Sequence, residues 1–440
     1  MRAMIFGAVV LILCLTKTQQ LESTPKERAE LEEKFKKIGD VSGPNETVET
    51  TDIIPSNSSG RHRRQAFRND RAKWTNGVVE YTFAPNLPEN VKNIFRKAAE
   101  AWSKSTCLDI HENANAKAKI MVAKGPGCMS SLGMQGNTQG LMLGDKCMTD
   151  LIRICITRDS QTELSELHAI VVGSAIHELG HALGLFHMQS RHDRDKYLLL
   201  NKDNINPDNE GDFKAETPER NENYDIPYDY GSIMHYHAWG FAKDTSKPTM
   251  VPKDEKYIRT LGSRVLSFYD KLLMNTHYGC LGKCDKNIKC ANGGFPNPKN
   301  CSECICPGGY GGELCDKRPK GCGKVVRATS TSPRKLNVFV GELREGEVSR
   351  ECTYWIEAPA ESKVELKLVS LSNWGIVGGC HIGGVEIKTQ EDQKATGYRF
   401  CTKSDIGMTL LSSSNRVPVM AYNHESVFEA TIEYKVVKPR

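Results

Sequence analysis

The sequence lacks a strong excess of either charge, an internal repeat and any apolar run of 18 residues. Its 440 residues include 59 Lys and Arg and 54 Asp and Glu, which gives a formal net charge of +5. This excess is too small to indicate nucleic-acid binding, and no RNP, helix-turn-helix or P-loop pattern supports that function. With 39% hydrophobic and 26% charged residues, the composition is that of globular domains. The length predicts about three of them.

The first 15 residues have the features of a secretory signal peptide. Met1-Arg2 gives a basic start, and Ala3 to Leu15 is apolar apart from one glycine. A run of 13 residues is too short to span a bilayer, although it could also form a buried N-terminal helix. We therefore predict a signal peptide over residues 1–18 and a secreted, extracellular protein without a membrane span.

Residues 19–64 are polar, rich in charge and poor in aromatic side chains. They contain N-glycosylation sequons at Asn45 and Asn57 and end in the basic cluster RHRR at residues 61–64. A basic cluster in an exposed polar segment is typical of a processing site, although it can also be a solvated charge run. We predict that residues 19–64 form a propeptide and that an activating protease specific for basic sites cuts after Arg64.

Regular patterning begins directly after this cluster. Residues 77–83 alternate between apolar and polar as a strand does, and Asn90 is a candidate cap for a helix whose apolar residues recur as far as Trp102. Residues 166–184 show a second, longer helical pattern. The part of the chain before Cys280 therefore combines strands and helices.

Beyond Cys280 the composition changes. Six of the 16 cysteines fall within residues 284–315, a segment with too few apolar residues to bury a core, so disulfides must stabilise it. A zinc cluster is the alternative, and it is disfavoured in a secreted chain. After a linker at residues 317–320, residues 322–437 carry short alternating runs that predict an all-β sandwich.

Residues 177–187 read HELGHALGLFH, which contains the extended pattern HExxHxxGxxH. His177 and His181 lie one helical turn apart, so both imidazoles can reach one Zn²⁺. Glu178 follows the first histidine and projects beside the pair, where it can act as a general base. The short HExxH pattern arises by chance on many helices, whereas the extended pattern is much more specific.

The second half of this pattern completes the expected metal site. Gly184 lets the chain leave the helix in a sharp turn, because a positive φ costs glycine little. His187 can then return to the metal as a third ligand. Three imidazoles leave one coordination position open for water, as in catalytic zinc sites. We therefore predict one catalytic Zn²⁺ bound by His177, His181 and His187.

This pattern, together with SIMHY at residues 232–236, resembles the astacin family of metzincin metalloproteases. The segments RHDRD at residues 191–195 and YDYG at residues 228–231 are similar to that family as well. The likeness covers residues 65–280. It implies an α+β catalytic domain with two lobes around an active-site cleft, a zinc helix and a Met-turn.

The resemblance also assigns roles to single residues. Glu178 would be the general base, Met234 would form the turn beneath the zinc, and Tyr236 would be a reversible zinc ligand whose hydroxyl stabilises the oxyanion. Family pro-segments often place an aspartate in the fourth zinc position, and Asp40 in the sequence KIGD is the candidate here, with lysine where the family has phenylalanine. Met188 is a second departure, because the family usually has glutamate directly after the third histidine.

The resemblance further implies how the cysteines pair. In the catalytic domain, Cys107 would pair with Cys280, and Cys128 would pair with Cys147 or alternatively with Cys155. Five cysteines are an odd number, so one thiol is left over.

The remaining cysteines resemble those of two extracellular modules. Those of residues 281–316 are similar to an EGF-like module, and those of residues 322–437 are similar to a CUB domain. The implied pairs are Cys284–Cys301, Cys290–Cys304, Cys306–Cys315, Cys322–Cys352 and Cys380–Cys401.

Two functions from different classes are compatible with these features. The first is a secreted zinc endopeptidase, made as a zymogen, that acts on extracellular matrix or cuticle proteins. The second is a catalytically silent interaction protein that works through its EGF-like and CUB modules. Silent relatives normally lack the base or a ligand. The sequence favours the enzyme, because all the expected residues are present: His177, Glu178, His181, His187 and Tyr236.

Overall fold

The computed structural model describes residues 66–125, 127–144, 163–285, 287–342, 350–372, 378–423 and 427–438. The described residues form two compact units. Unit 1 comprises residues 70–102 and 108–184, and unit 2 comprises residues 66–69, 103–107 and 185–438. The predicted signal peptide and propeptide lie outside the described residues. So do the sites predicted within them: Asp40, Asn45, Asn57 and Arg64.

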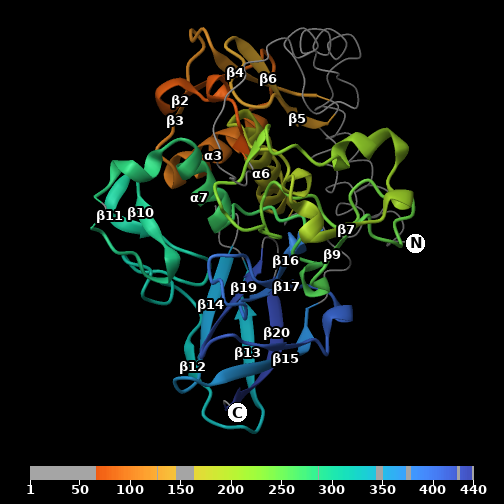
Figure 1. Ribbon diagram of the computed structural model, residues 1–440, viewed down its shortest axis with the longest axis vertical. Coiled ribbons are helices and arrows are strands. Elements are labelled where there is room, and N and C mark those ends of the chain that lie inside the picture. Colours follow the sequence, from red (N-terminus) through yellow and green to blue (C-terminus); the bar gives the residue numbers. More distant parts are fainter. Residues whose placement is uncertain are drawn as a thin grey trace, which may run out of the picture. The chain divides into compact units, whose positions relative to one another are not determined.

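Unit 1 is built on a five-stranded sheet (Figure 1). Its strands are β2 (Val78–Phe83), β3 (Asp109–Glu112), β4 (Lys119–Ala123), β5 (Cys128–Ser130) and β6 (Thr138–Leu143). The order is β3-β2-β4-β6-β5, in which β5 pairs antiparallel and the other pairs are parallel. The strand predicted at residues 77–83 is therefore present as β2.

Two helices accompany this sheet: α3 (Glu89–Ser105), whose last residues belong to unit 2, and α6 (Glu163–Ala182). The apolar face predicted for α3 is buried and ends at Trp102, whose indole Nε1 donates a 3.0 Å hydrogen bond to the carbonyl of Ile176 in α6. The cap predicted at Asn90 was wrong. The carbonyl of Pro88 already accepts from the amide of Lys92, so Pro88 is the cap and the helix begins at Glu89, two residues earlier than a cap at Asn90 predicts.

The first part of unit 2 consists of short elements. Two small antiparallel sheets pair β1 (Ala66–Phe67) with β8 (Asn221–Glu222), and β7 (Leu198–Leu200) with β9 (Met250–Pro252). Its one α-helix among the described residues is α7 (Phe268–His277), which begins with a capping box between Ser267 and Asp270. The remaining chain of this part includes the 3₁₀ turns η3 (Met188–Ser190), η4 (Arg194–Lys196), η5 (Lys202–Asn204), η6 (Pro207–Phe213), η7 (Glu255–Tyr257) and η8 (Cys280–Lys283).

A disulfide-rich module follows. Its hairpin consists of β10 (Phe295–Asn297) and β11 (Asn300–Ile305). The disulfides are Cys284–Cys301, Cys290–Cys304 and Cys306–Cys315. Few of its apolar side chains are buried, so these cross-links supply the stability that a core would otherwise give.

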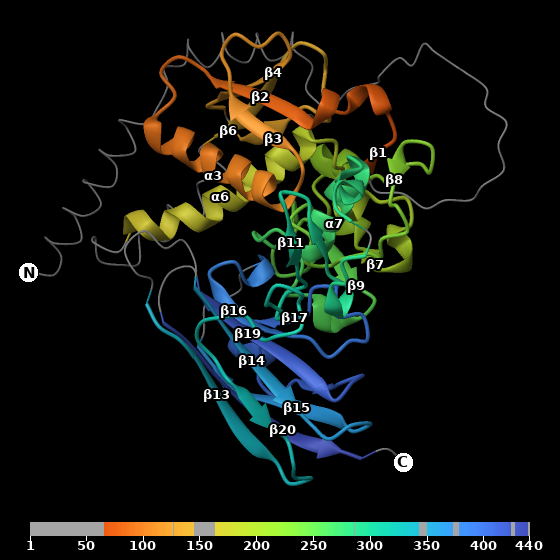
Figure 2. The same cartoon turned by 90° about the vertical axis from the view of Figure 1, so that its left-hand side faces the viewer.

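The last module of unit 2 is a β-sandwich (Figure 2). One sheet has the order β12-β14-β19-β16-β17 and the other β13-β20-β15-β18. The strands are β12 (Val325–Arg327), β13 (Arg334–Val340), β14 (Arg350–Glu357), β15 (Lys363–Leu371), β16 (Gly383–Ile387), β17 (Tyr398–Phe400), β18 (Thr409–Leu411), β19 (Arg416–Asn423) and β20 (Phe428–Val437). Disulfides join Cys322 to Cys352 and Cys380 to Cys401.

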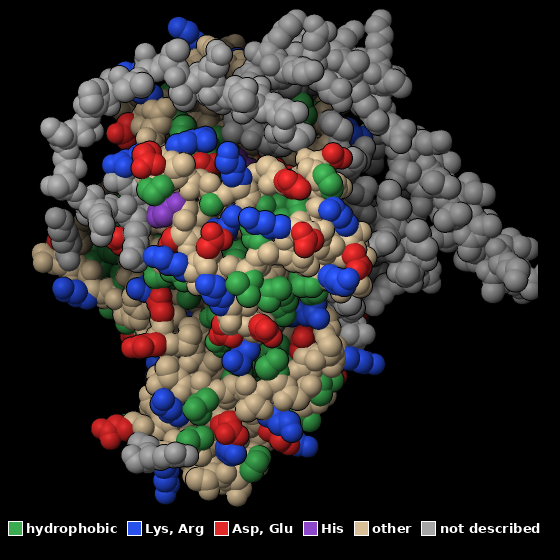
Figure 3. Space-filling view, turned by 45° about the vertical axis from the view of Figure 1, so that its right-hand side comes forward, with side chains coloured by type: hydrophobic (Ala, Val, Ile, Leu, Met, Phe, Trp, Pro, Cys, Tyr) green, Lys and Arg blue, Asp and Glu red, His purple; other side chains and the backbone are tan. Residues whose placement is uncertain are grey.

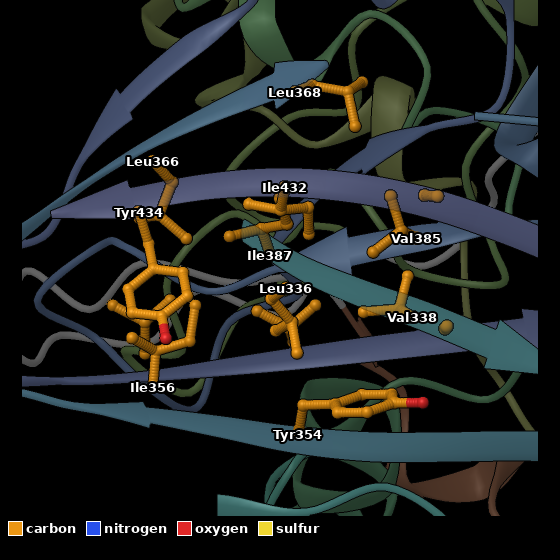
Figure 4. Packing of buried hydrophobic residues seen from close by; sticks show 14 of the residues in the cluster. Leu336, Val338, Tyr354, Ile356, Leu366, Leu368, Val385, Ile387, Ile432 and Tyr434 are labelled. Atoms are coloured by element: carbon orange, nitrogen blue, oxygen red, sulfur yellow. The ribbon is translucent and has the colours of Figure 1, made fainter. Parts of the chain in front are cut away.

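The core of the sandwich lies between the two sheets. Along β20 every second side chain is buried, as the period of two in a strand requires. Figure 4 shows Ile432 of β20 and Leu336 of β13 near Ile387, which comes from the other sheet. The predicted fold is confirmed: a domain of helices and strands, then a disulfide-rich module, then an all-β sandwich.

The surface agrees with the near-balanced charge. On the described part of the face in Figure 3, Lys and Arg side chains are interspersed with Asp and Glu. Within the ranges given above, no helix combines the length and the apolar character that crossing a bilayer requires.

Candidate zinc centre

The last turns of α6 carry two of the expected ligands. Leu179 and Ala182 of these turns are fully buried. His177 and His181 stand one turn apart, with 3.1 Å between their Nε2 atoms and ring planes at 86°. Glu178, between them in sequence, is buried with 6% of its surface exposed.

The helix ends where the sequence predicts a turn. The amide of Gly184 donates a 2.8 Å hydrogen bond to the carbonyl of His181, and Gly184 has φ of 98°, a conformation that side chains other than glycine rarely adopt. Two further groups of unit 1 bind the carbonyls of this last turn. The indole of Trp74 donates to Ala182 at 2.8 Å, and the amide of Gly133 donates to His181 at 2.8 Å.

The third ligand follows the glycine turn and joins the pair. Ring nitrogens of His177, His181 and His187 all lie within 4.8 Å of one another. Zinc–nitrogen bonds of about 2.0–2.1 Å place tetrahedral ligand atoms about 3.4 Å apart, so three imidazoles at this spacing fit one zinc ion. Among the described residues, this is the group of histidine, cysteine and carboxylate side chains placed to hold a metal.

Tyr236 lies against the third histidine. The ring centroids of Tyr236 and His187 are 4.4 Å apart and the planes are tilted by 53°. The amide of Tyr236 donates to Oε1 of Gln189 at 3.1 Å, which fixes its backbone to the segment that follows His187. The ring centroids of Phe213 and Phe241 also lie near that of Tyr236, at 6.0 and 5.3 Å.

The turn that contains Met234 is fully buried and hydrogen-bonded on both sides. Met234 has no exposed surface, its amide donates to Ser232 Oγ at 3.1 Å, and its carbonyl accepts from the amide of Met188 at 2.8 Å. The side chain of Met188 is buried in an apolar cluster with Leu198 and Tyr228. The residue that replaces the family's usual glutamate therefore serves here as part of a hydrophobic core.

A buried carboxylate that the sequence reasoning missed supports this turn. Asp270 accepts hydrogen bonds from Ser232 Oγ at 2.5 Å and from the amide of Ile233 at 2.9 Å. Burial, and secondarily the nearby charge of Asp229, raises the pKa of Asp270 to about 6. The sequence did contain a signal for it, because Ser267 and Asp270 form the S-x-x-D pattern of a capping box.

The segment RHDRD at residues 191–195 contains a buried ion pair near the third histidine. Arg191, with 2% of its side chain exposed, forms a two-pronged ion pair with Asp193, at 2.9 and 3.0 Å. Its Nη1 also donates to the carbonyls of Ile226 and Pro227, each at 3.2 Å. Burial alone would raise the pKa of Asp193, but the Arg191 guanidinium outweighs it and holds this pKa below its usual value. Arg191 therefore connects the segment after His187 to residues 226–227, which precede the Met234 turn.

The structure also joins Cys107 to Cys280, with Cα atoms 5.3 Å apart, so the end of α3 is linked to the end of α7. Cys128 lies in β5. Cys147 and Cys155 lie outside the described residues, so the pairing of Cys128 with Cys147 stays a prediction.

A zinc helix, a glycine turn and a third histidine beside a buried methionine turn define a metallopeptidase of the metzincin type. The model of the astacin peptidase family matches residues 66–155 and 160–279. The chain is 33% identical over 393 residues to zinc metalloproteinase nas-25 of Caenorhabditis elegans, covering 86% of this chain and 92% of that protein. It therefore belongs to the astacin family of zinc metalloproteinases, and the three histidines are the zinc-binding triad typical of that family.

Two other relatives from Caenorhabditis elegans are longer than this chain. Zinc metalloproteinase nas-31 is 40% identical over 401 residues, which are 89% of this chain and 61% of the relative. Zinc metalloproteinase nas-32 is 34% identical over 407 residues, which are 91% of this chain and 58% of the relative. The chain thus spans about three fifths of the length of these two relatives.

Proposed function

We propose that this protein is a secreted zinc-dependent endopeptidase that is made as a zymogen. The observation that carries the proposal is the convergence of three imidazoles within 4.8 Å, with a carboxylate, Glu178, next to His177 but outside that group. Three neutral nitrogen ligands leave an open coordination position, which distinguishes catalytic from structural zinc sites.

The mechanism follows from what the surrounding side chains can do. His177, His181 and His187 would hold the zinc ion, which would supply Lewis-acid chemistry at this site. Glu178 accepts a proton from the attacking water and later delivers it to the leaving amine. The hydroxyl of Tyr236, whose ring lies 4.4 Å from that of His187, donates to the oxyanion of the tetrahedral intermediate.

Latency rests on the segment before residue 66. We propose that residues 1–18 are a signal peptide, that residues 19–64 are a propeptide removed after Arg64, and that Asp40 occupies the fourth zinc position before removal. Ala66, two residues after Arg64, is fully buried and pairs with Glu222 and Leu185, so a chain that begins at residue 65 retains these contacts.

The remaining assignments concern organisation and substrates. We propose a catalytic domain over residues 65–280, an EGF-like module over 281–316 and a CUB domain over 322–437. The six disulfides found in the described residues support an extracellular location, because such bonds persist in oxidising compartments. The proposed substrates are proteins of the extracellular matrix or cuticle, and Asn45 and Asn57 are the proposed glycosylation sites.

The test is casein zymography of the secreted, processed chain with and without a zinc chelator. We expect a cleared band that the chelator abolishes and that added zinc restores, together with one zinc ion per chain by elemental analysis. N-terminal sequencing should find processing after Arg64, and labelling of new amino termini in a matrix extract should identify substrates. A processed, zinc-loaded chain that cleaves no protein would leave a catalytically silent interaction protein instead.

A further inference from the structure

Within unit 2, the β-sandwich touches the segment that leads into the Met234 turn. The contact centres on Asp229, whose side chain has 1% of its surface exposed. The carboxylate accepts two hydrogen bonds from Thr396 of the sandwich, from the amide to Oδ1 and from the hydroxyl to Oδ2, each at 3.2 Å. Its other partners, the amide of Gly231 at 3.3 Å and the Ser267 hydroxyl, belong to the catalytic domain.

Burying a carboxylate is costly unless hydrogen bonds replace its water. Burial raises the pKa of Asp229, and the donors around it counteract that rise. Thr396 supplies two of these donors. The hydrogen bonding of the Asp229 carboxylate is therefore shared between the sandwich and the catalytic domain. Without Thr396 the carboxylate would have to rehydrate or take up a proton, and either change would require the surrounding turn to move.

Asp229 is connected to the zinc centre by a short series of backbone contacts. The amide of Ser232 donates to the carbonyl of Asp229 at 3.2 Å, and Ser232 Oγ accepts from the amide of Met234 at 3.1 Å. Met234 in turn binds Met188, the residue that follows the third histidine. These bonds link the backbone at Asp229 to Met234, two residues before Tyr236, and to Met188, which follows His187.

The fit at this contact is close enough to restrict side chains. A Cβ placed on Gly231 would lie 2.3 Å from Cγ2 of Thr396, so only glycine is accommodated there. The same applies beside Tyr236, because a Cβ on Gly378 of the sandwich would lie 2.4 Å from Cβ of His237. Gly231 of the catalytic domain and Gly378 of the sandwich thus allow close contact before and after Met234 in the sequence, at residues 231 and 237.

Further polar contacts surround the Thr396 contact. Arg399 of β17 donates through Nη1 to Ser263 Oγ at 2.9 Å and through its amide to Thr260 Oγ1 at 3.1 Å. Its charge is balanced inside the sandwich by Glu386 at 3.0 Å. The hydroxyl of Tyr398 donates to Asp254 at 2.6 Å. These contacts make the interface between the sandwich and the catalytic domain a polar one.

The loop that bears Thr396 is itself held by the disulfide-rich module. The buried ammonium of Lys388 donates to the carbonyl of Gly308 in the disulfide-rich module and to the carbonyl of Gln393 in the loop. Lys388 thus links the loop to that module. The hydroxyl of Tyr310 also donates to Oε1 of Gln393 at 3.0 Å. These bonds connect the loop that bears Thr396 to the disulfide-rich module.

We propose that Thr396 is a positioning residue for the peptidase centre: by holding Asp229 it fixes the turn that carries Met234 and Tyr236, so that the CUB-like sandwich is a structural part of the active site. This inference rests on the proposed peptidase function. It implies that the sandwich contributes to the catalytic rate and not only to recognition of distant parts of the substrate.

The test uses the full, processed chain with single substitutions. Thr396→Val removes the hydroxyl donor at nearly constant shape, and Thr396→Ser restores it. Thr431→Val is the matched control, because the Thr431 hydroxyl binds Asn337 within the sandwich. On a peptide substrate that spans only the scissile bond and its near neighbours, we expect kcat of Thr396→Val to fall about 10- to 100-fold with KM within about twofold of wild type, as for misplacement of a reacting group.

The serine variant and the Thr431→Val control should keep the wild-type kcat. An unchanged kcat in Thr396→Val, or an equal loss in the Thr431→Val control, would overturn the proposal. If Thr396→Val does not accumulate as folded protein, Asp229→Asn replaces it, and a wild-type kcat in that variant overturns the proposal as well.

A second readout separates this inference from the proposed function. The visible spectrum of the cobalt-substituted protein reports the geometry at the histidine triad without requiring turnover. We expect the spectrum to change in Thr396→Val and not in Thr431→Val. A wild-type chain without peptidase activity whose cobalt spectrum still responds to Thr396→Val would contradict the peptidase function and retain the positioning role. An identical spectrum in all variants would contradict the positioning role.

Discussion

The backbone amide of Met188 donates a 2.8 Å hydrogen bond to the carbonyl of Met234. The residue after the third histidine is thus tied, backbone to backbone, to the buried turn that precedes Tyr236. Because the bond does not involve the side chain of residue 188, methionine can occupy the position where the family usually has glutamate. Its side chain adds to the apolar cluster instead.

Substitution of the proposed base should separate metal binding from turnover. Glu178 lies beside the triad, so Glu178→Ala should keep one zinc ion per chain and lose activity by a factor of about 10²–10⁴, the usual contribution of a positioned acid or base. Elemental analysis and casein hydrolysis measure the two effects. His187→Ala is the counterpart and should lose the zinc as well. An active Glu178→Ala enzyme would remove this residue from the mechanism.

Tyr236→Phe should slow turnover without releasing the metal. Loss of one donor to an oxyanion typically costs on the order of 10²–10³ in kcat, and the ring contact with His187 is retained. Steady-state kinetics on a peptide substrate test this. Tyr434→Phe in the sandwich is the control and should leave kcat unchanged. If Tyr236→Phe turned over at the wild-type rate, Tyr236 would have only a packing role.

Gly184→Ala should destabilise the chain between the second and third ligands. A residue other than glycine at φ of 98° costs on the order of 1–3 kcal/mol. We expect a lower thermal midpoint and weaker retention of zinc against a competing chelator. Gly211→Ala is the control, because a Cβ at that position meets nothing within 4 Å. Equal midpoints and equal zinc retention for both variants would contradict the role of the turn.

The raised pKa of Asp270 predicts a pH-dependent stability. The folded-state pKa of about 6 lies above the ordinary value of 3.8, so its protonation stabilises the folded state fully below about pH 4 and that contribution disappears as the pH rises to about 6. Relative to Asp270→Asn, the wild type should lose on the order of 3 kcal/mol across this window. Scanning calorimetry of both proteins from pH 4 to pH 7 measures the difference in midpoint. A difference that stays constant with pH would show that Asp270 titrates normally.

Helices and strands with one buried face were predictable from the sequence, because burial of that face makes apolar residues recur at the period of the element. The strand at residues 78–83, the zinc helix and the sandwich strands all follow from such patterns. The position of helix ends was less certain. Asn90 is a good capping residue by type, yet the carbonyl of Pro88 makes the first bond of α3. The zinc helix begins at Glu163 and ends at Ala182, rather than spanning residues 166–184.

The amino-acid sequence by itself determined the metal ligands of this protein. Two histidines one helical turn apart, a glycine able to adopt positive φ and a third histidine are spaced by local geometry, which a linear pattern records. Only the tertiary structure decided what holds those ligands in place. Asp270 and Thr396 lie far along the chain from the Met234 turn. Asp270 accepts hydrogen bonds from Ser232 and Ile233, and Thr396 donates to Asp229, so these contacts depend on folding that no sequence period encodes.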